Sequence, residues 1–277
     1  MPEIRHLPEA PTGRRPLPPG AGIDAHRHDT HQIVYACRGV LSVTTGTGIW
    51  VAPANRAIWV PAGTVHEHRA HGDTDLRLVG LTGNPLGLER PAVLVVRPLL
   101  RELIIAYTDP TGPSDGPSTG PSGGPPGGAP ITPQSSGPAA GGREGDGGER
   151  ERLLAVLLDQ LSSAPEQALH LPAPRDSRLA AVCALLHRDP ADNSTLDQLA
   201  ARAGTSGRTL ARLFRAELGM SFPQWRTQLR LHHALLLLAD GVPVTAVAHR
   251  CGWASASAFI DVFRRAFGYT PGRAFTM

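Results

Sequence analysis

A pattern of small and apolar residues that occurs twice between residues 195 and 275 constrains this sequence more than any other feature. Ala200 and Gly204 lie four positions apart, and Ala248 and Gly252 repeat the pair at the same spacing. Small residues let two helices cross closely, and glycine tolerates the positive φ angle that a tight turn requires. An apolar stripe at helical spacing follows each pair. The stripes are Leu210, Leu213, Phe214 and Leu218 in the first copy and Phe259, Val262 and Phe263 in the second. The pattern predicts two helix-turn-helix units.

One long helix is predicted to join the two units. A capping box at Thr195 and Gln198 opens the first unit, and a second box at Ser221 and Gln224 opens the joining helix, which ends at Gly241. About 18 residues at roughly 1.5 Å each form a rod on the order of 27 Å long. A rod of this length suits two recognition helices that enter the same face of DNA about one helical turn apart.

Residues 176–277 resemble the AraC/XylS transcriptional regulators. The matching residues are the runs AGTSGRTLARLF (203–214) and GWASASAFIDVFRRAFGYTPGRAF (252–275), together with Arg230 and Ala234 in the joining helix. The resemblance implies binding to promoter DNA, a homodimer, and RNA polymerase as a further partner. The sequence departs from the family pattern at Ala258, where a bulky aromatic residue is common, and at Asp261, where a basic residue is common.

The first recognition helix is expected to carry the main DNA contacts. Arg208 and Arg212 share a helix face that avoids the apolar stripe, and both match family positions that face the major groove. Arginine binds the edge of guanine through two hydrogen bonds, so these residues are candidates for base contacts. A solvated charged face is the alternative interpretation. The other candidates for base or phosphate contacts are Ser206, Thr209, Arg226, Ser255, Ser257, Arg264 and Arg265. Because Asp261 repels phosphate, we expect the second unit to read fewer bases.

The distribution of charge and cysteine agrees with this interpretation. Residues 175–277 contain 13 Arg and 7 Asp or Glu, a net charge of +6, whereas the rest of the chain has a net charge of −3. A basic C-terminal part on a slightly acidic body fits contact with nucleic acid. Three scattered cysteines, no signal sequence and no apolar run of about 18 residues predict a cytoplasmic protein, associated with the bacterial nucleoid when bound to DNA.

The N-terminal part has the pattern of a small β-barrel. Six short segments rich in β-forming residues lie between about residues 23 and 81 and are separated by turn residues, which predicts an antiparallel barrel or sandwich. His26, His28 and Gln32 share parity, so their side chains point to one face of an extended strand. These residues and the run PAGTVH (61–66) resemble the two motifs of the cupins. The resemblance implies a jelly-roll barrel in which His26, His28, Gln32 and His66 bind one metal ion.

Two departures from the cupin pattern affect the expected chemistry. Gln32 stands where a glutamate is usual, and Ala70 stands where an asparagine is usual. Neutral nitrogen ligands and one amide leave the charge of a divalent ion uncompensated, and such a site suits Zn, Ni, Cu or Fe better than Mg or Ca. A metal-free pocket for an organic effector is an open alternative. His68 shares parity with His66 and is a further candidate for the same pocket.

The sequence therefore predicts an α+β protein with several regions. These are a disordered Pro-rich tail (1–20), a cupin-like sensor domain (21–108), a disordered Gly/Pro/Ser-rich linker (109–148), a helix with a hinge (149–175) and the DNA-binding domain (176–277). The apolar stripes of the predicted helices 97–108 and 149–163 are expected to pack on the barrel, to pair with each other or to form a dimer seam. A transcriptional regulator controlled by a small ligand or metal is the favoured function. A metal-dependent cupin enzyme, a dioxygenase or isomerase tethered to DNA, is the alternative, but no acid/base pair accompanies the histidines, so an enzyme is not expected.

Overall fold

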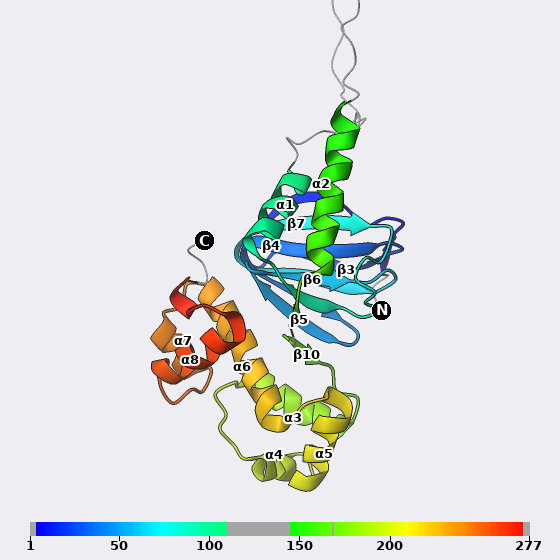
Figure 1. The fold of residues 1–277 in the computed structure, drawn as a ribbon. Coiled ribbons are helices and arrows are strands. Elements are labelled where there is room, and N and C mark those ends of the chain that lie inside the picture. Colours follow the sequence, from blue (N-terminus) through cyan, green and yellow to red (C-terminus); the bar gives the residue numbers. More distant parts are fainter. Residues whose placement is uncertain (1–3, 110–144, 168, 274–277) are drawn as a thin grey trace, which may run out of the picture.

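The computed structural model describes residues 4–109, 145–167 and 169–273, and Figure 1 shows a β-rich domain above a helical domain. Most of the predicted Gly/Pro/Ser-rich linker lies outside the described residues. The strands are β1 (Arg5–Leu7), β2 (Gly13–Leu17), β3 (Gly22–His28), β4 (His31–Thr45), β5 (Gly48–Pro53), β6 (Arg56–Val60), β7 (His66–Leu81), β8 (Ala92–Val95), β9 (Glu166–Gln167) and β10 (His170–Pro172). The helices are α1 (Pro98–Thr108), α2 (Gly145–Ser162), α3 (Ser177–Arg188), α4 (Leu196–Arg202), α5 (Gly207–Leu218), α6 (Phe222–Ala239), α7 (Val244–Arg250) and α8 (Ala256–Phe267), followed by a 3-10 turn (Pro271–Arg273).

Two long strands, β4 and β7, are the central strands of the barrel. They pair antiparallel along most of their length, and β4 also pairs with β5 and β6 while β7 also pairs with β2 and β3. Register shifts around Arg38 bend β4 where Gly39 adopts a φ of 83°. A Cβ atom at Gly39 would lie 2.8 Å from the carbonyl oxygen of Asp73, so only glycine fits here. Apolar side chains fill the barrel interior on both sides of this bend, with Val34, Leu41, Ile58 and Leu76 fully buried.

Helices α1 and α2 cover the outer face of the barrel (Figure 1). Leu100 and Ile104 of α1 and Leu157 and Leu161 of α2 are buried against the sheet, in one cluster with Trp59 and other side chains of β4, β6 and β8. The apolar stripes of both helices therefore pack on the barrel and against each other, which are two of the three alternatives that the sequence left open. A dimer seam at the residues that remain exposed, such as Leu99 and Val156, stays a prediction.

The prediction of a disordered tail at residues 1–20 is wrong for the described part. Strand β1 pairs parallel with β3, and β2 pairs antiparallel with β7. The Ala10 amide donates to Thr30 Oγ1 at 2.7 Å, and Leu17 is 6% exposed. Proline is tolerated on edge strands, because one side of such a strand needs no hydrogen-bond donors. Composition alone therefore misjudged a segment that the barrel orders through long-range pairing.

The predicted hinge at residues 164–175 also contributes to the sheet, since β9 pairs with β8 and β10 pairs with β5.

The helical domain follows, and its helix caps confirm the predicted helix boundaries. Thr195 and Gln198 form a capping box, and so do Ser221 and Gln224. Gly219 ends α5 in the left-handed region, with a φ of 68°. The joining helix α6 has 18 residues, as its caps predicted.

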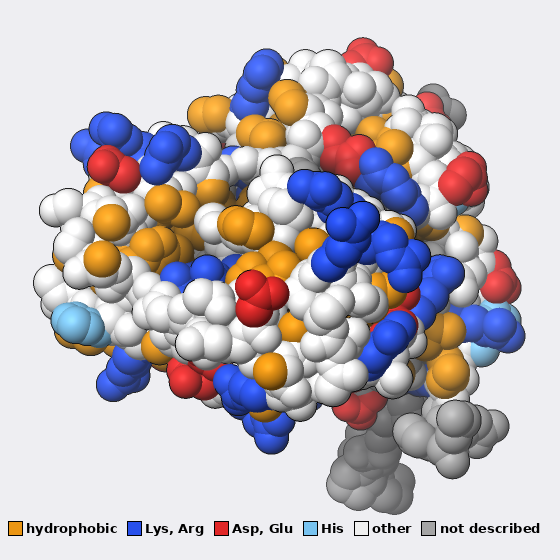
Figure 2. Space-filling view, turned by 90° about the horizontal axis from the view of Figure 1, so that it is seen from below, with side chains coloured by type: hydrophobic (Ala, Val, Ile, Leu, Met, Phe, Trp, Pro, Cys, Tyr) orange, Lys and Arg blue, Asp and Glu red, His pale blue; other side chains and the backbone are white. Residues whose placement is uncertain are grey.

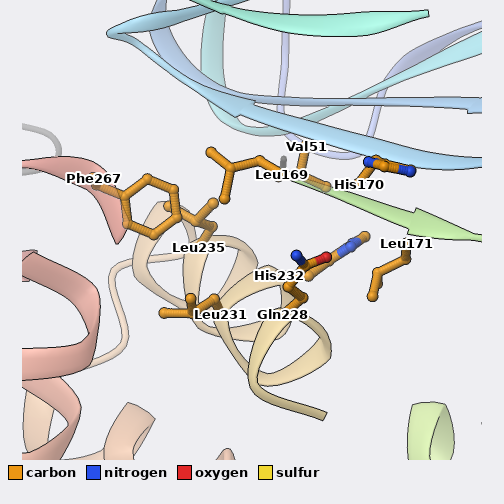
Figure 3. Close-up of a pocket in the computed structure, with 9 residues that line it drawn as sticks. All are labelled: Val51, Leu169, His170, Leu171, Gln228, Leu231, His232, Leu235 and Phe267. Carbon is orange, nitrogen blue, oxygen red and sulfur yellow. The ribbon is translucent and has the colours of Figure 1, made fainter. Parts of the chain in front are cut away.

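The two domains contact each other along α6 and the end of α8. Leu231, Leu235 and Leu238 of α6 share an apolar cluster with Val40 and Val51 of the barrel. Figure 3 shows this contact, where Leu231, Leu235 and Phe267 face Val51 and the β10 segment around a small cavity of about 20 Å³. At the end of α8, the buried Arg56 donates to the Phe267 carbonyl at 3.3 Å, and the Gln167 amide donates to the Ala266 carbonyl. The barrel therefore holds the C-terminal end of α8.

Candidate nucleic-acid interface and histidine centre

Helix α5 presents an unpaired cationic face. Leu210, Leu213 and Phe214 turn inward and are buried, which leaves Arg208, Arg212 and Arg215 exposed on the opposite side. These three arginines line a shallow groove with Thr209, Ala211 and Ala216. None of the three has a hydrogen-bond or ion-pair partner among the described residues. Unpaired guanidinium groups on an amphipathic helix are available to an external anion such as DNA. We call this surface of α5 the DNA face.

The cap of α5 positions this face. Ser206 Oγ accepts from the Thr209 amide at 3.2 Å, and the two hydroxyl oxygens lie 3.0 Å apart. Both hydroxyls sit at the N-terminal end of the helix, where backbone N–H groups favour anions. Seen from the end that the helical domain occupies, arginine side chains form a band across the molecular surface (Figure 2). The predicted Ser206, Arg208, Thr209 and Arg212 thus lie together on one accessible helix.

The second helix-turn-helix unit differs from the first because the arginines of its recognition helix contact groups of the same helix. Ser255 caps α8 by accepting from the Ala258 amide at 3.1 Å, and Ser257 is exposed nearby. Asp261 lies 3.7 Å from the Arg264 guanidinium, and its carbonyl accepts from Arg265 Nε at 3.2 Å. Both arginines are exposed but are drawn toward their own helix. Asp261 therefore offsets part of the cationic charge of this unit.

Arg226 is half-buried near the start of α6 and contacts other residues of the helical domain. Its Nη1 donates to the Ser194 carbonyl at 3.0 Å, and its guanidinium stacks 4.5 Å from the centre of the Phe222 ring. Burial lowers the pKa of this guanidinium, although Asp192 acts in the opposite direction. In this structure Arg226 braces the start of α6 against the loop before α4.

Strands β3 and β7 bring four histidines together inside the barrel. His26 pairs with His66 across the two strands, and His28 and His68 follow on the same face. Gln32 of β4 lies beside them and is fully buried. The ring centres of His26 and His66 are 4.3 Å apart, and those of His66 and His68 are 5.0 Å apart. We call His26, His28, His66, His68 and Gln32 the histidine centre.

Backbone carbonyls fix the tautomer of three of these histidines. Nδ1 of His26, His28 and His66 contacts the carbonyl oxygens of Asp24, Thr30 and Thr64 at 2.8, 2.6 and 2.8 Å. A carbonyl only accepts, so Nδ1 carries the proton and Nε2 keeps its lone pair. Metal-binding histidines are oriented in this way by a partner of their second nitrogen.

The inward-facing atoms of the centre lack protein partners. His28 Nε2, His66 Nε2, both ring nitrogens of His68 and Gln32 Oε1 are buried without a hydrogen bond within the described structure. Burial lowers the pKa of His66 to about 4 and the pKa of His28 below its usual value. Burial also lowers the pKa of His68 well below its usual value. The imidazoles of His28, His66 and His68 are therefore neutral near pH 7, which is the form that binds metals.

The structure changes the expected ligand set. Ligand atoms of His26, His66 and His68 all lie within 4.8 Å of one another, so His68 joins the residues that the sequence brought together. His28 and Gln32 belong to the same centre, each with a buried ligand atom that has no partner in the described structure, and their role as ligands stays a prediction. The resemblance to cupins implied His28 and Gln32 as metal ligands, and His68 was only a further candidate. The parity of His68 with His66 nevertheless indicated that its side chain points into the barrel. Three imidazole ligands suit a transition-metal ion, and the orphaned buried nitrogens fit such an ion better than an empty apolar core.

Two family models match the chain. A model described as a helix-turn-helix domain matches residues 199–277, and a model described as a cupin domain matches residues 14–82. The geometry and these matches define a DNA-binding transcriptional regulator with a cupin domain. No helix within the described ranges is both long and apolar enough to cross a membrane.

The curated relatives identify the family. The HTH-type transcriptional regulator NimR of Escherichia coli is 31% identical over 251 residues, which cover 90% of this chain and 80% of NimR. RipA of Corynebacterium glutamicum is 42% identical over 119 residues, and the arabinose operon regulatory protein of Escherichia coli is 31% identical over 132 residues; these two matches cover 43% and 46% of this chain and 34% and 45% of the relatives. The chain belongs to the AraC family of helix-turn-helix transcriptional regulators. Its relatives are regulators and not enzymes.

Solved structures give shorter or weaker matches. The DNA-binding domain of AdpA, in complex with a target DNA, is 34% identical and covers 36% of this chain and 92% of that chain, with a TM-score of 0.35. ToxT from Vibrio cholerae with a bound unsaturated fatty acid is 12% identical and covers 100% of this chain and 98% of that chain, with a TM-score of 0.37.

Proposed function

We propose that this regulator recognises a specific promoter sequence mainly through the DNA face of α5, and that a transition-metal ion or a small ligand at the histidine centre controls its occupancy. The observation that supports recognition by α5 is the set of three exposed arginines without partners, Arg208, Arg212 and Arg215. Arg208 and Arg212 are the expected readers of guanine edges. The hydroxyls of Ser206 and Thr209 are expected to donate to phosphate.

The second unit has a smaller share in this proposal. Ser255 and Ser257 are its candidates for polar contacts with bases, and Arg264 and Arg265 are its candidates for phosphate contacts. A homodimer that places two such chains on neighbouring half-sites, beside RNA polymerase, completes the proposed assembly. A regulator of this kind works in the cytoplasm, on the nucleoid.

Control by a metal is supported by the converging lone pairs of His26, His66 and His68. These residues would hold a divalent ion such as Zn, Ni, Cu or Fe, with His28 and Gln32 next to it. A bound ion would supply a charge that links β3 to β7 inside the sensor. Differential binding of the ion to two states of the protein would shift the population of the state that binds DNA. A metal-free pocket for an organic effector is the competing form of the proposal.

Recognition is tested with Arg208→Ala and Arg212→Ala, and Arg188→Ala serves as a control on the exposed side of α3. The two α5 variants should weaken binding to a specific promoter site by about 5- to 150-fold each and should weaken non-specific DNA binding much less. The control should change neither. Equal losses on specific and random DNA would show that both arginines only contact phosphate.

Control by the centre is tested by metal analysis of protein purified without a polyhistidine tag. Wild-type protein should bind about one zinc or nickel ion per chain, and His26→Ala with His66→Ala should bind none while leaving the helical domain folded. The same double variant should lose its response to the effector in a reporter assay. If the wild-type protein contained no metal and the double variant still responded to the effector, the metal form of the proposal would be refuted.

A further inference from the structure

A cavity of about 620 Å³ opens onto the histidine centre between the N-terminal strands and the barrel. His26, His68 and Gln32 form its polar floor, and Leu78 lies beside them. His68 is only 2% exposed, and neither of its ring nitrogens has a partner in the described structure. The cavity therefore has room for a small organic molecule that reaches a metal ion at the centre.

Arg15 lines this cavity from an exposed position on β2. Leu17 of β2 is buried in the barrel interior, and Arg15 shares its parity, so the two side chains point to the same face. The adjacent Arg14 points to the other face, where its Nε lies 2.8 Å from Asp75 Oδ1. Arg15 lines the cavity together with His68 and has no hydrogen-bond or ion-pair partner among the described residues.

The four charged side chains that line the cavity balance one another, since Arg5 and Arg15 stand with Glu9 and Asp24. An ion held by the imidazoles would therefore bring its double charge to a cavity whose own charged side chains sum to zero.

We propose that the occupant of this cavity is a small organic carboxylate that completes the coordination of the metal ion and pairs with Arg15. The inference rests on the metal form of the proposed function. One carboxylate oxygen compensates the ion, and the planar guanidinium binds a carboxylate through parallel hydrogen bonds. A neutral sugar or amide would leave the charge of the ion unbalanced. Because β2 lies at the N-terminal edge of the sheet, binding by Arg15 also ties this edge strand to β3 and β7.

The test uses the full chain loaded with cobalt, whose visible absorption reports its coordination, and acetate as the probe. Acetamide has nearly the same shape without the charge and serves as the matched ligand control. Arg15→Gln removes the proposed contact. Arg27→Gln removes the same charge from an exposed position of β3 that lies between His26 and His28 but points away from the cavity. Circular dichroism and the cobalt spectrum without acetate establish that both variants fold and bind the ion.

Acetate should change the cobalt spectrum of the wild-type protein, and acetamide should not. Arg15→Gln should weaken acetate binding about tenfold, Arg15→Lys should recover only part of it, and Arg27→Gln should bind acetate like the wild type. The inference would be overturned if cobalt bound normally and acetate did not change its spectrum. It would also be overturned if the two glutamine variants bound acetate with equal affinity. Neither result would contradict the proposed metal sensor. A phosphate response in place of an acetate response would overturn the assignment of a carboxylate. Failure of cobalt to bind, with His66→Ala identical to wild type, would refute the metal sensor and the inference with it.

Discussion

The contact between the barrel and the end of α8 depends on Arg56, and Arg56→Met should loosen it. The Arg56 side chain is 5% exposed and has no carboxylate partner in the described structure. It donates to the carbonyls of Asn55 at 2.9 Å and Phe267 at 3.3 Å and to the side-chain oxygen of Gln167. Gln167 in turn donates to the Ala266 carbonyl. One cross-domain hydrogen bond is therefore direct, and a second depends on an oriented Gln167.

The expected magnitude follows from these bonds. A hydrogen bond from a charged donor contributes about 1.5–3 kcal/mol, and a neutral one contributes about 0.5–1.5 kcal/mol. Burial lowers the pKa of Arg56, which shows that its charge is partly stripped of water, so removing it also relieves a desolvation cost. We expect a net loss of about 2 kcal/mol in the docking free energy, or about a 30-fold shift toward the separated domains.

The assay is energy transfer between dyes at exposed positions 38 of the barrel and 250 of α7, followed across a urea series. The three native cysteines are buried and need not be replaced. Arg56→Met should lose interdomain transfer at a lower urea concentration, by an amount equivalent to about 2 kcal/mol. Arg265→Met is the control, because Arg265 is an exposed arginine near the same end of α8 that contacts only its own helix. Equal midpoints for the two variants would refute the role of Arg56.

The remaining predictions concern the helical domain. Gly204 and Gly252 both have positive φ angles, but a Cβ at Gly252 would lie 2.8 Å from Ala191 Cα whereas the space at Gly204 is open. Gly204→Ala should therefore cost about 1 kcal/mol in urea unfolding and Gly252→Ala about 3 kcal/mol, and equal costs would contradict this explanation. Burial, and then His187, lowers the pKa of His233 to about 4. Because the unfolded state binds the proton first, the unfolding free energy should fall as pH decreases from about 6.5 to 4, and His233→Gln should flatten this dependence.

Much of the helical domain could be predicted from local signals. Capping boxes, small residues at the turns and glycine at helix ends act within a few residues, so Thr195, Ser221 and Gly219 marked boundaries that the structure confirms. The alternation of side chains along a strand is an equally local signal, and it predicted that His26 and His66 point into the barrel. The fold class and the family followed from these features.

Contacts between residues that are distant in the sequence were harder to predict. The prediction for residues 1–20 relied on proline content, and the pairing of β1 and β2 with distant strands ordered them instead. The cupin motif pointed to His26, His28, Gln32 and His66, and only the fold showed that ligand atoms of His68 lie close enough to those of His26 and His66 to share one metal ion. The contact of Arg226 with DNA stays a prediction, and its hydrogen bond to the Ser194 carbonyl, 32 positions away, was not predicted.

The sequence by itself determined the two helix-turn-helix units, the exposed arginines of α5 and the presence of an inward histidine cluster, because helix and strand periodicity select one face from neighbouring residues alone. Only the tertiary structure decided which histidines meet, that Arg15 faces the cavity and that Arg56 holds the end of α8. These contacts join residues up to 211 positions apart, and their geometry depends on strand register and domain packing, which local patterns do not encode.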